Sequence, residues 1–297
     1  MQPALASALE RFDTAAYAWR DYLKKPLERL RIELSWASLC QHLPRQPIDI
    51  LDIGGGTGEM AVRLVRAGHT VTLLDPPPTM LAIAREQAMG VLGPQERPRL
   101  RIAEATLGEL RKQYPAARFS AILCHATMEY LREEQQAWQD LASFARPNAL
   151  ISIVVPNREA AALHVARRGI MPMALEALTT PRAEPDVVFG IQRRTYDVPT
   201  LRQRFAEVGI EPQALFGVRV AADYMPDTTL ANDPNGVLQF ELAAGAMDPY
   251  QRVARLLHAV GIRRAQAQEP TLSPEDLVLE STGEEDVTRI NTARFRR

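Results

Sequence analysis

The sequence predicts an α/β fold, with a seven-stranded, mostly parallel sheet and helices on both of its faces. Two observations carry this prediction. Between about residues 48 and 156, short apolar runs alternate with helical patterns, which is typical of parallel strands joined by crossover helices. The first run ends in a glycine-rich turn, and the second ends in an acid, Asp75. Turns of this kind lie at the carboxyl edge of a parallel sheet, where ligands bind.

The composition is that of an ordinary globular protein and excludes several classes. The 297 residues suffice for one sizeable α/β domain with additions. A formal net charge of −1 argues against a chain that coats nucleic acid through bulk charge. No apolar stretch approaches the ~20 residues that a bilayer requires, and the N-terminus lacks a signal-peptide pattern, so we expect a cytoplasmic protein. Cys40 and Cys124 show no metal or redox spacing, and both are expected to be buried thiols.

Residues 1–47 predict a helical cap that precedes the sheet. Residues 5–43 have a helical pattern, in which apolar residues recur from Leu27 to Leu43. Pro44 and Pro47 then end the pattern, because proline cannot continue a helix.

The main domain is predicted to span residues 48–263, and its first half alternates between strands and helices. Five strands are expected, at Ile48–Ile53, Thr70–Leu74, Arg99–Ala103, Phe119–Cys124 and Leu150–Val155. Helices are expected between them, at Thr57–Ala67, Thr79–Met89, Leu107–Gln113 and Glu133–Ala145.

The second half of the domain begins with an interruption. Residues 157–200 contain several prolines and little strand pattern, so we expect a helical lid insertion after the fifth strand. The sheet is then completed by a helix at Thr200–Val208, a strand at Glu211–Val218, a helix at Val237–Ala246 and a strand at Leu256–Ile262. Residues 264–297 are expected to form a polar C-terminal tail, because they contain little apolar sequence.

The glycine-rich turn predicts a cofactor that contains adenosine. It reads Asp52-Ile53-Gly54-Gly55-Gly56-Thr57-Gly58, and Asp75 ends the next strand. A dinucleotide fingerprint would have a third glycine by position 59, which is Glu59 here, and no Lys-Ser/Thr pair follows to make a phosphate loop. The string instead fits the (D/E)-x-G-x-G-x-G pattern of S-adenosylmethionine-dependent methyltransferases. Asp75 could hold the ribose hydroxyls, or it could cap the following helix.

Further residues resemble the bacterial tRNA 5-carboxymethoxyuridine methyltransferase family, which belongs to class I. They are the segment His125–Leu131, the group Leu30, Arg31 and Trp36, and the segment Gly217–Val220 with Asp223 and Tyr224. The resemblance covers roughly residues 10–263. It implies a Rossmann-like methyltransferase sheet and an enzyme that moves a methyl group from S-adenosylmethionine to the carboxylate of a modified wobble uridine.

The resemblance also implies cofactor contacts. Arg31 would reach the cofactor carboxylate, Asp75 would hold the ribose, and His125 would close over the cofactor as the candidate catalytic residue. The remaining cofactor-binding candidates are Asp52, Gly54, Gly55 and Gly56 from the turn, and Ala105 and Thr106 beside the adenine. A lone histidine is otherwise more often a satisfied core residue.

The substrate side has fewer candidates. Asn157 matches the family pattern after the fifth strand and would face the substrate. Arg219 and Tyr224 could anchor an anionic substrate, or they could pair with Asp223 instead.

The methyl acceptor stays open between tRNA and a small-molecule acid. The resemblance favours RNA, whereas the apolar, lysine-free segment Gly169–Leu178 favours a small molecule, because phosphate contacts supply much of a nucleic-acid binder's affinity. A carboxylate nucleophile needs no general base, unlike a hydroxyl. A non-catalytic S-adenosylmethionine-binding partner protein and an NAD-dependent oxidoreductase are the alternatives from other classes. We expect no metal, no membrane association, and a monomer or homodimer.

Overall fold

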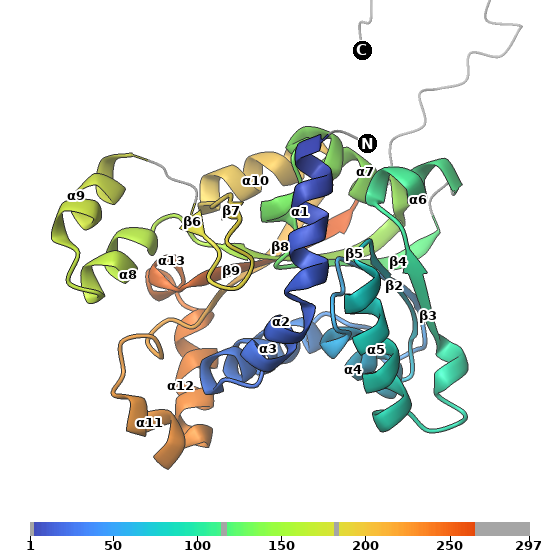
Figure 1. Cartoon of the computed structure of the whole chain (residues 1–297), viewed down its shortest axis with the longest axis horizontal. Coiled ribbons are helices and arrows are strands. Elements are labelled where there is room, and N and C mark those ends of the chain that lie inside the picture. The colour runs from blue at the N-terminus through green and yellow to red at the C-terminus, as the bar shows by residue number, and fades with distance from the viewer. Residues whose placement is uncertain (1–2, 114–117, 181–183, 265–297) are drawn as a thin grey trace, which may run out of the picture. The chain divides into compact units, whose positions relative to one another are not determined.

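The computed structural model describes residues 3–113, 118–180 and 184–264. Seven strands form one sheet in the order β3-β2-β1-β4-β5-β9-β8 (Figure 1). Their bounds are β1 Asp49–Ile53, β2 Thr70–Asp75, β3 Leu100–Glu104, β4 Phe119–His125, β5 Ala145–Pro156, β8 Ile210–Val218 and β9 Leu256–Arg263. The predicted fold class is confirmed.

The sheet is parallel except at one strand. β1 to β5 pair in parallel, whereas β9 runs antiparallel to both of its neighbours, β5 and β8. The chain moves outward from β1 to β3 and then returns to the other side of β1 with β4. This reversal places the carboxyl ends of β1 and β4 at the topological switch point, where doubly wound sheets bind ligands.

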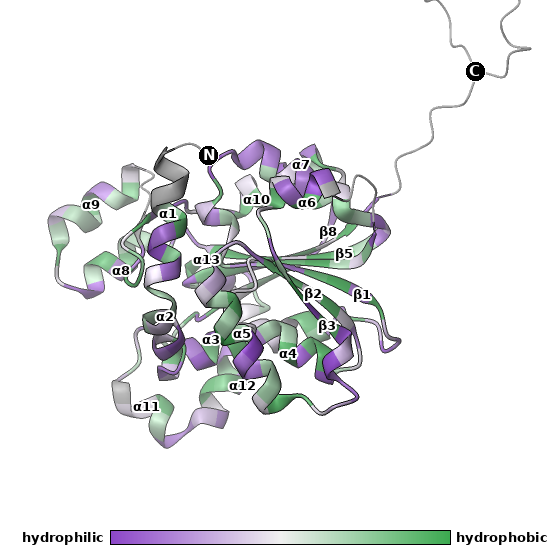
Figure 2. Ribbon diagram, turned by 45° about the vertical axis from the view of Figure 1, so that its right-hand side comes forward, coloured by the Kyte–Doolittle hydropathy of each residue, from purple (hydrophilic) through white to green (hydrophobic). Residues whose placement is uncertain are grey.

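Helices cover both faces of the sheet (Figure 1). One face packs against α6 Leu107–Gln113, α7 Glu134–Phe144 and α10 Val198–Glu207, and its core includes the fully buried Trp138, Phe144 and Phe205. The other face packs against α3 Pro26–Cys40, α4 Glu59–Arg66 and α5 Pro78–Val91, around Leu39, Leu64 and Leu81. Figure 2 shows the apolar strands between these two layers.

Two further helices precede α3, namely α1 Pro3–Thr14 and α2 Ala16–Tyr22. Phe12, Trp19, Met80 and Phe189 form one apolar cluster, so the N-terminal helices pack on α5 and on a later loop. Asp13 Oδ1 also accepts a hydrogen bond from Thr79 N at 2.7 Å. A side chain of α1 therefore caps the N-terminus of α5, where backbone donors lack helical partners.

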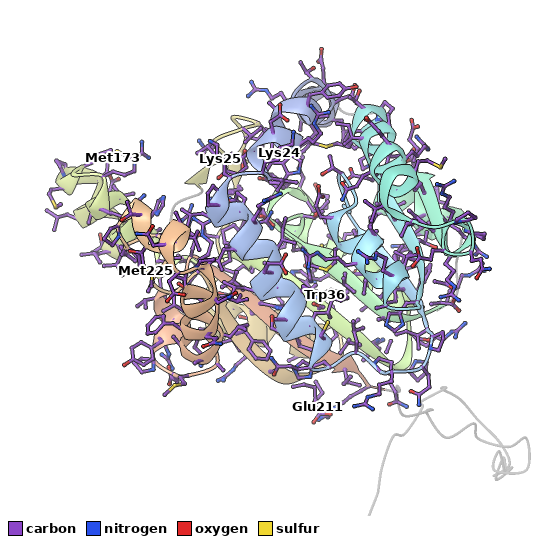
Figure 3. The ribbon with its side chains drawn as sticks, turned by 90° about the horizontal axis from the view of Figure 1, so that it is seen from below. Lys24, Lys25, Trp36, Met173, Glu211 and Met225 are labelled. Atoms are coloured by element: carbon purple, nitrogen blue, oxygen red, sulfur yellow. The ribbon has the colours of Figure 1, made fainter. Side chains whose placement is uncertain are left out.

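The region predicted as a lid holds two helices and a short β-hairpin. They are α8 Ala161–Arg167, α9 Met171–Thr179, β6 Glu184–Pro185 and β7 Gln192–Arg193. α9 exposes Met171, Met173, Leu175 and Leu178, and Met173 points away from the sheet in Figure 3. Whether this region acts as a lid stays a prediction.

Three helices follow β8, namely α11 Asp227–Asn232, α12 Pro234–Gly245 and α13 Tyr250–Val253. Short 3-10 helices lie elsewhere, at Arg97–Arg99 before β3 and at Met128–Tyr130 after β4. Glu241 of α12 is fully buried, and its carboxylate accepts hydrogen bonds from Val220 N, Ala221 N and Ala222 N at 2.5–2.8 Å. This carboxylate fixes the loop that follows β8.

A few local predictions differ from the structure. β5 begins at Ala145, which pairs with Phe119, so the predicted start at residue 150 was five residues late. Cys124 is buried as predicted, but Cys40 is exposed at the end of α3, so that prediction was wrong. The predicted tail lies outside the described residues, except for residue 264.

Candidate active site

The glycine turn joins β1 to α4 in a backbone conformation that other residues rarely adopt. Gly54, Gly56 and Gly58 have φ values of 65°, 54° and 90°. A Cβ on Gly54 would lie 2.2 Å from Thr127 Oγ1, so glycine is also required there for space. A Cβ on Gly56 would contact only Trp19 Nε1 and Asp75 Oδ2, at 3.8 and 4.0 Å. Gly56 therefore borders open space.

That space is a cavity of about 480 Å³, which we call the glycine cavity. The cavity is walled by the ends of β1, β2 and β4 and by α1 and α2. Five predicted cofactor residues line it: Gly54, Gly56, Asp75, Ala105 and Thr106. Its apolar walls include Phe12, Trp19, Met80 and Phe189, which could enclose a flat aromatic group.

Asp75 stands at the tip of β2 and faces the glycine turn. Its Oδ2 accepts a hydrogen bond from Gly56 N at 2.7 Å, so Asp75 ties the turn to β2. Burial raises the pKa of Asp75 to about 7, and the hydrogen bond from Gly56 opposes that rise. The N-cap of α5 is Pro77, so the alternative role of Asp75 as a helix cap was wrong.

Asp52, in β1, is a buried acid with an unsatisfied oxygen. Its Oδ2 has no hydrogen-bond partner among the described residues. Burial, with the nearby charges of Asp75 and Glu59, raises the pKa of Asp52 to about 7. An orphan carboxylate oxygen beside a glycine turn fits a cationic ligand, and S-adenosylmethionine carries a sulfonium and an ammonium group.

A second cavity of about 490 Å³ adjoins the first, and we call it the arginine cavity. Trp19, Ala126 and Tyr130 line both cavities, so the two share a wall at the end of β4. Lys25, at the turn between α2 and α3, also lines the arginine cavity (Figure 3). Its other charged and imidazole side chains are Glu28, Arg31, Glu129, His164, Arg167, Asp186, Arg193, Arg219, Asp223 and Arg255.

A buried ion-pair network forms one wall of the arginine cavity. Arg219 donates from Nη1 to Glu28 Oε1 at 2.7 Å, from Nε to Asp223 Oδ2 at 2.8 Å, and from Nη2 to Asp223 Oδ1. Arg31 Nε donates to the other oxygen of Glu28 at 2.7 Å. Burial alone would raise the pKa of Glu28, but the charges of Arg31 and Arg219 hold it at about 2.

The two arginines of this network differ in the donors they keep for a ligand. Arg219 uses its Nε and both Nη atoms, so its guanidinium already has carboxylate partners on both sides. Arg31 uses only Nε, and its Nη atoms have no hydrogen-bond partner in the described part of the chain. Arg31 can therefore receive a ligand carboxylate, whereas Arg219 holds the wall in place.

His125 lies at the end of β4 on the α3 face of the sheet. Its Nε2 is 2.8 Å from Ser152 Oγ, and its Nδ1 is buried without a partner among the residues described. Burial, with smaller contributions from His258 and Arg31, holds the pKa of His125 well below its usual value. The imidazole is therefore neutral near pH 7.

Other predicted residues serve the framework. Asn157 is fully buried, and its amide donates to Arg252 O at 2.7 Å and Ala254 O at 2.8 Å. Tyr224 is 42% exposed, and it lines neither of the two cavities, nor does Asn157. Gly55 packs tightly, since a Cβ there would lie 2.6 Å from Leu73 Cγ. Thr106 accepts and donates hydrogen bonds with Glu109, which caps α6.

Sequence reasoning missed two acids of the arginine cavity, Glu28 and Glu129. The spacing of Glu28 and Arg31, three residues apart in a helix, could have revealed the first. Glu129 is 3% exposed, and neither carboxylate oxygen has a hydrogen-bond partner among the described residues. Burial raises its pKa to about 7, and no local pattern signals that burial.

Among the described residues, no cluster of three or more His, Cys, Asp or Glu side chains is arranged to hold a metal ion. No helix in that part of the chain is long and apolar enough to cross a membrane.

Comparisons with known proteins agree with this geometry. Residues 50–148 match a family model described as a methyltransferase domain. The tRNA 5-carboxymethoxyuridine methyltransferase of Escherichia coli K12 is 24% identical over 81% of this chain and 90% of its own length. The ubiquinone biosynthesis O-methyltransferase of Paracidovorax citrulli is 26% identical over 53% of this chain and 65% of its own.

A solved structure shares the fold. It is the 1,6-didemethyltoxoflavin-N1-methyltransferase of Burkholderia thailandensis, with bound 1,6-didemethyltoxoflavin and S-adenosylhomocysteine. The TM-score is 0.54 at 17% identity, over 89% of this chain and 92% of that one.

Proposed function

Given that this chain is an S-adenosylmethionine-dependent methyltransferase, we propose that it methylates the carboxylate of a modified wobble uridine in tRNA. The proposal joins two parts. The glycine cavity would hold the cofactor, and the arginine cavity would hold an acidic acceptor beside it. The length over which the chain matches the tRNA enzyme of E. coli supports RNA as the acceptor.

The charge of the arginine cavity is the observation that carries the proposal. Six cationic side chains line it, from Lys25 and five arginines, against four carboxylates. The surplus is two positive charges in the unliganded cavity, and the cofactor carboxylate on Arg31 would reduce it to one. Protonation of Glu129, whose pKa is about 7, would raise the surplus again. A cavity of this sign next to the cofactor would attract a negatively charged acceptor.

The chemistry that such an acceptor needs also fits the site. Bound S-adenosylmethionine supplies a methyl group on a sulfonium, so the departing group is neutral. The protein must then align the acceptor oxygen with the methyl group and exclude water. A carboxylate is already a nucleophile, so the reaction needs no base from the neutral, buried His125.

We assign the cofactor contacts as follows. Asp75 would accept from the ribose, Asp52 and the glycine turn would face the methionine part, and Arg31 would bind its carboxylate through the free Nη atoms. The N-terminal residues 1–47 would close the glycine cavity, because Phe12 and Trp19 line it. Residues 157–200 would cover the arginine cavity, because His164, Arg167 and Arg193 line that one.

The experiment is methyl transfer to tRNA that carries 5-carboxymethoxyuridine. The full chain is incubated with labelled S-adenosylmethionine. The nucleosides are then separated, and their masses are measured by mass spectrometry. We expect the wobble nucleoside to gain one methyl group as an ester, and Asp75→Ala to abolish the gain. If no tRNA is methylated, the assignment is wrong.

A small-molecule acid is the second candidate, and one feature favours it. α9 exposes four large apolar side chains, and α8, on which it packs, contributes His164 and Arg167 to the arginine cavity. An acid with an apolar tail could use both surfaces. Methylation of small acids in a cell extract, without methylation of tRNA, would select this candidate, whereas cofactor binding with no product in either would indicate a non-catalytic partner protein.

A further inference from the structure

A series of hydrogen bonds through three buried side chains connects α3 to His125, a partly buried residue at the end of β4. Ser38 Oγ is 2.8 Å from His258 Nδ1, His258 Nε2 is 2.7 Å from Ser152 Oγ, and Ser152 Oγ is 2.8 Å from His125 Nε2. Ser38, Ser152 and His258 are at most 2% exposed. The strand register places them together, because Ser152 pairs with Leu123, two residues before His125, and His258 pairs with Val154.

The donor and acceptor in each of these hydrogen bonds follow from Ser38. Ser38 Oγ lies 2.7 Å from Leu34 O, and a carbonyl oxygen can only accept. Ser38 therefore donates to Leu34 O and accepts from His258 Nδ1. The opposite direction would leave two oxygens 2.7 Å apart with no proton between them.

The donors and acceptors of the remaining hydrogen bonds, from His258 to His125, can be assigned in the same way. Burial lowers the pKa of His258 to about 3, so His258 is neutral, and with Nδ1 protonated its Nε2 must accept. Ser152 then donates to His258 and accepts from His125 Nε2. The neutral His125 is left with a lone pair on Nδ1, which has no partner among the described residues.

The position of His125 indicates which ligand group this lone pair would meet. Asp52 pairs with Leu123, which lies two residues before His125. His125 is therefore on the same face of the sheet as Asp52 and two residues nearer its carboxyl edge. The next residue, Ala126, lines both cavities, and Arg31 is close enough to affect the pKa of His125. The methionine part of the cofactor offers one cationic donor, its α-ammonium group, which has three N–H bonds and can serve both Asp52 and His125.

We propose that Ser38, His258 and Ser152 are positioning residues, which fix His125 with Nε2 protonated so that Nδ1 accepts a hydrogen bond from the α-ammonium group of the cofactor. The inference rests on S-adenosylmethionine as the cofactor and is independent of the methyl acceptor. Ser38 touches neither cavity, so its effect on the cofactor would pass through three side chains.

Binding of two ligands tests the proposal. S-adenosylhomocysteine carries the amino acid part, and 5′-methylthioadenosine lacks it, so calorimetry with both separates the two halves of the site. We expect Ser152→Ala to lower the affinity for S-adenosylhomocysteine about tenfold or more, as for a lost hydrogen bond to a charged group. The affinity for 5′-methylthioadenosine should stay within about twofold of its original value. The matched control is Ser143→Ala, whose hydroxyl donates to Asp140 O in α7. Equal weakening of both ligands, or of neither, would overturn the proposal.

Nitrogen NMR of the histidine rings gives a second readout on the unliganded protein. The chain has five histidines, so the spectrum is small, and His125→Asn assigns the signal of interest. We expect a protonated Nε2 and an unprotonated Nδ1 in His125, and Ser38→Ala should change that tautomer from the far end of the series. A proton on Nδ1 of the unmodified protein would contradict the inference. None of these measurements involves a methyl acceptor, so they are independent of the tRNA proposal.

Discussion

The two cavities differ in how the chain builds them. The floor of the glycine cavity comes from one short backbone turn. Ile53, Gly54 and Gly56 of that turn line the cavity, and Asp75 holds the turn through one hydrogen bond. The arginine cavity rests on side chains that are far apart in sequence, such as Glu28 and Arg219, which are 191 positions apart. The glycine turn of the first cavity is thus a local property of the chain, whereas the apolar walls of that cavity and the whole second cavity exist only when distant elements have packed.

The largest effect should come from adding one methyl group to the glycine turn. Gly54→Ala places a Cβ against Thr127 at a positive φ, and left-handed backbone and overpacking each cost about 1–3 kcal/mol. We expect S-adenosylhomocysteine affinity to fall about 100-fold in calorimetry. Gly90→Ala is the control, because its Cβ would meet nothing within 4 Å. Similar affinities in the two variants would show that the turn is less rigid than described.

The ion-pair network of the arginine cavity should control stability more than cofactor binding. Glu28→Gln removes the carboxylate that Arg31 and Arg219 share, and breaking a buried pair costs about 3 kcal/mol. Urea unfolding should report this loss. Asp21→Asn breaks only exposed pairs with Arg20 and Lys24, and it should cost less than about 1 kcal/mol. Equal costs would contradict a structural role for the buried network.

The acidity of Glu28 gives that network a defined pH range. Its pKa is lowered from 4.5 to about 2, so its contribution to stability is present above pH 4.5 and is lost as the pH falls toward 2. Glu28→Gln should remove this part of the acid sensitivity in unfolding measured from pH 6 to pH 2.5. Parallel curves for the variant and the unmodified protein would assign the acid sensitivity to other groups.

The two acids beside the glycine turn, Asp52 and Asp75, should respond to pH in the opposite sense. The pKa values of Asp52 and Asp75 are raised to about 7, so folding stability from these groups falls as the pH rises from about 4 to 7. A cationic ligand favours their ionised forms, so affinity for S-adenosylmethionine should rise several-fold from about pH 6 to pH 7.5. Asp52→Asn should flatten the rise. An unchanged slope in that variant would exclude Asp52 as its source.

The smallest effect should come from one arginine at the rim of the arginine cavity. Arg167→Ala removes a side chain that lines the cavity, whereas Arg168→Ala removes a neighbour that does not. We expect the first to raise the KM for tRNA a few-fold with no change in S-adenosylhomocysteine affinity, because exposed charges are screened by salt. The second should change neither, and equal effects would place the acceptor elsewhere.

The comparison also explains how far the sequence could be interpreted. Apolar runs and the glycine turn predicted where the strands lie and placed Gly54, Gly56 and Asp75 together, because these features depend on residues near one another in the chain. The exposure of Cys40, the start of β5 at Ala145 and the pairing of Arg219 with Glu28 depend on tertiary packing. The chain that joins Ser38 to His125 had no sequence signal either, since its members lie on α3, β4, β5 and β9.

The buried Glu241 has a consequence for how such enzymes diversify. Its carboxylate binds three consecutive backbone amides, so α12 carries with it the loop that presents Arg219 and Asp223. Residues 219–245 thus form a segment that keeps the Glu241 hydrogen bonds within itself, and its bond from Arg219 to Glu28 is the contact that a relative would have to match. A chimaera that receives this segment from a relative would acquire a new acceptor wall while its glycine turn stays untouched. Specificity for the methyl acceptor can therefore change by exchange of this segment, while the cofactor-binding site stays the same.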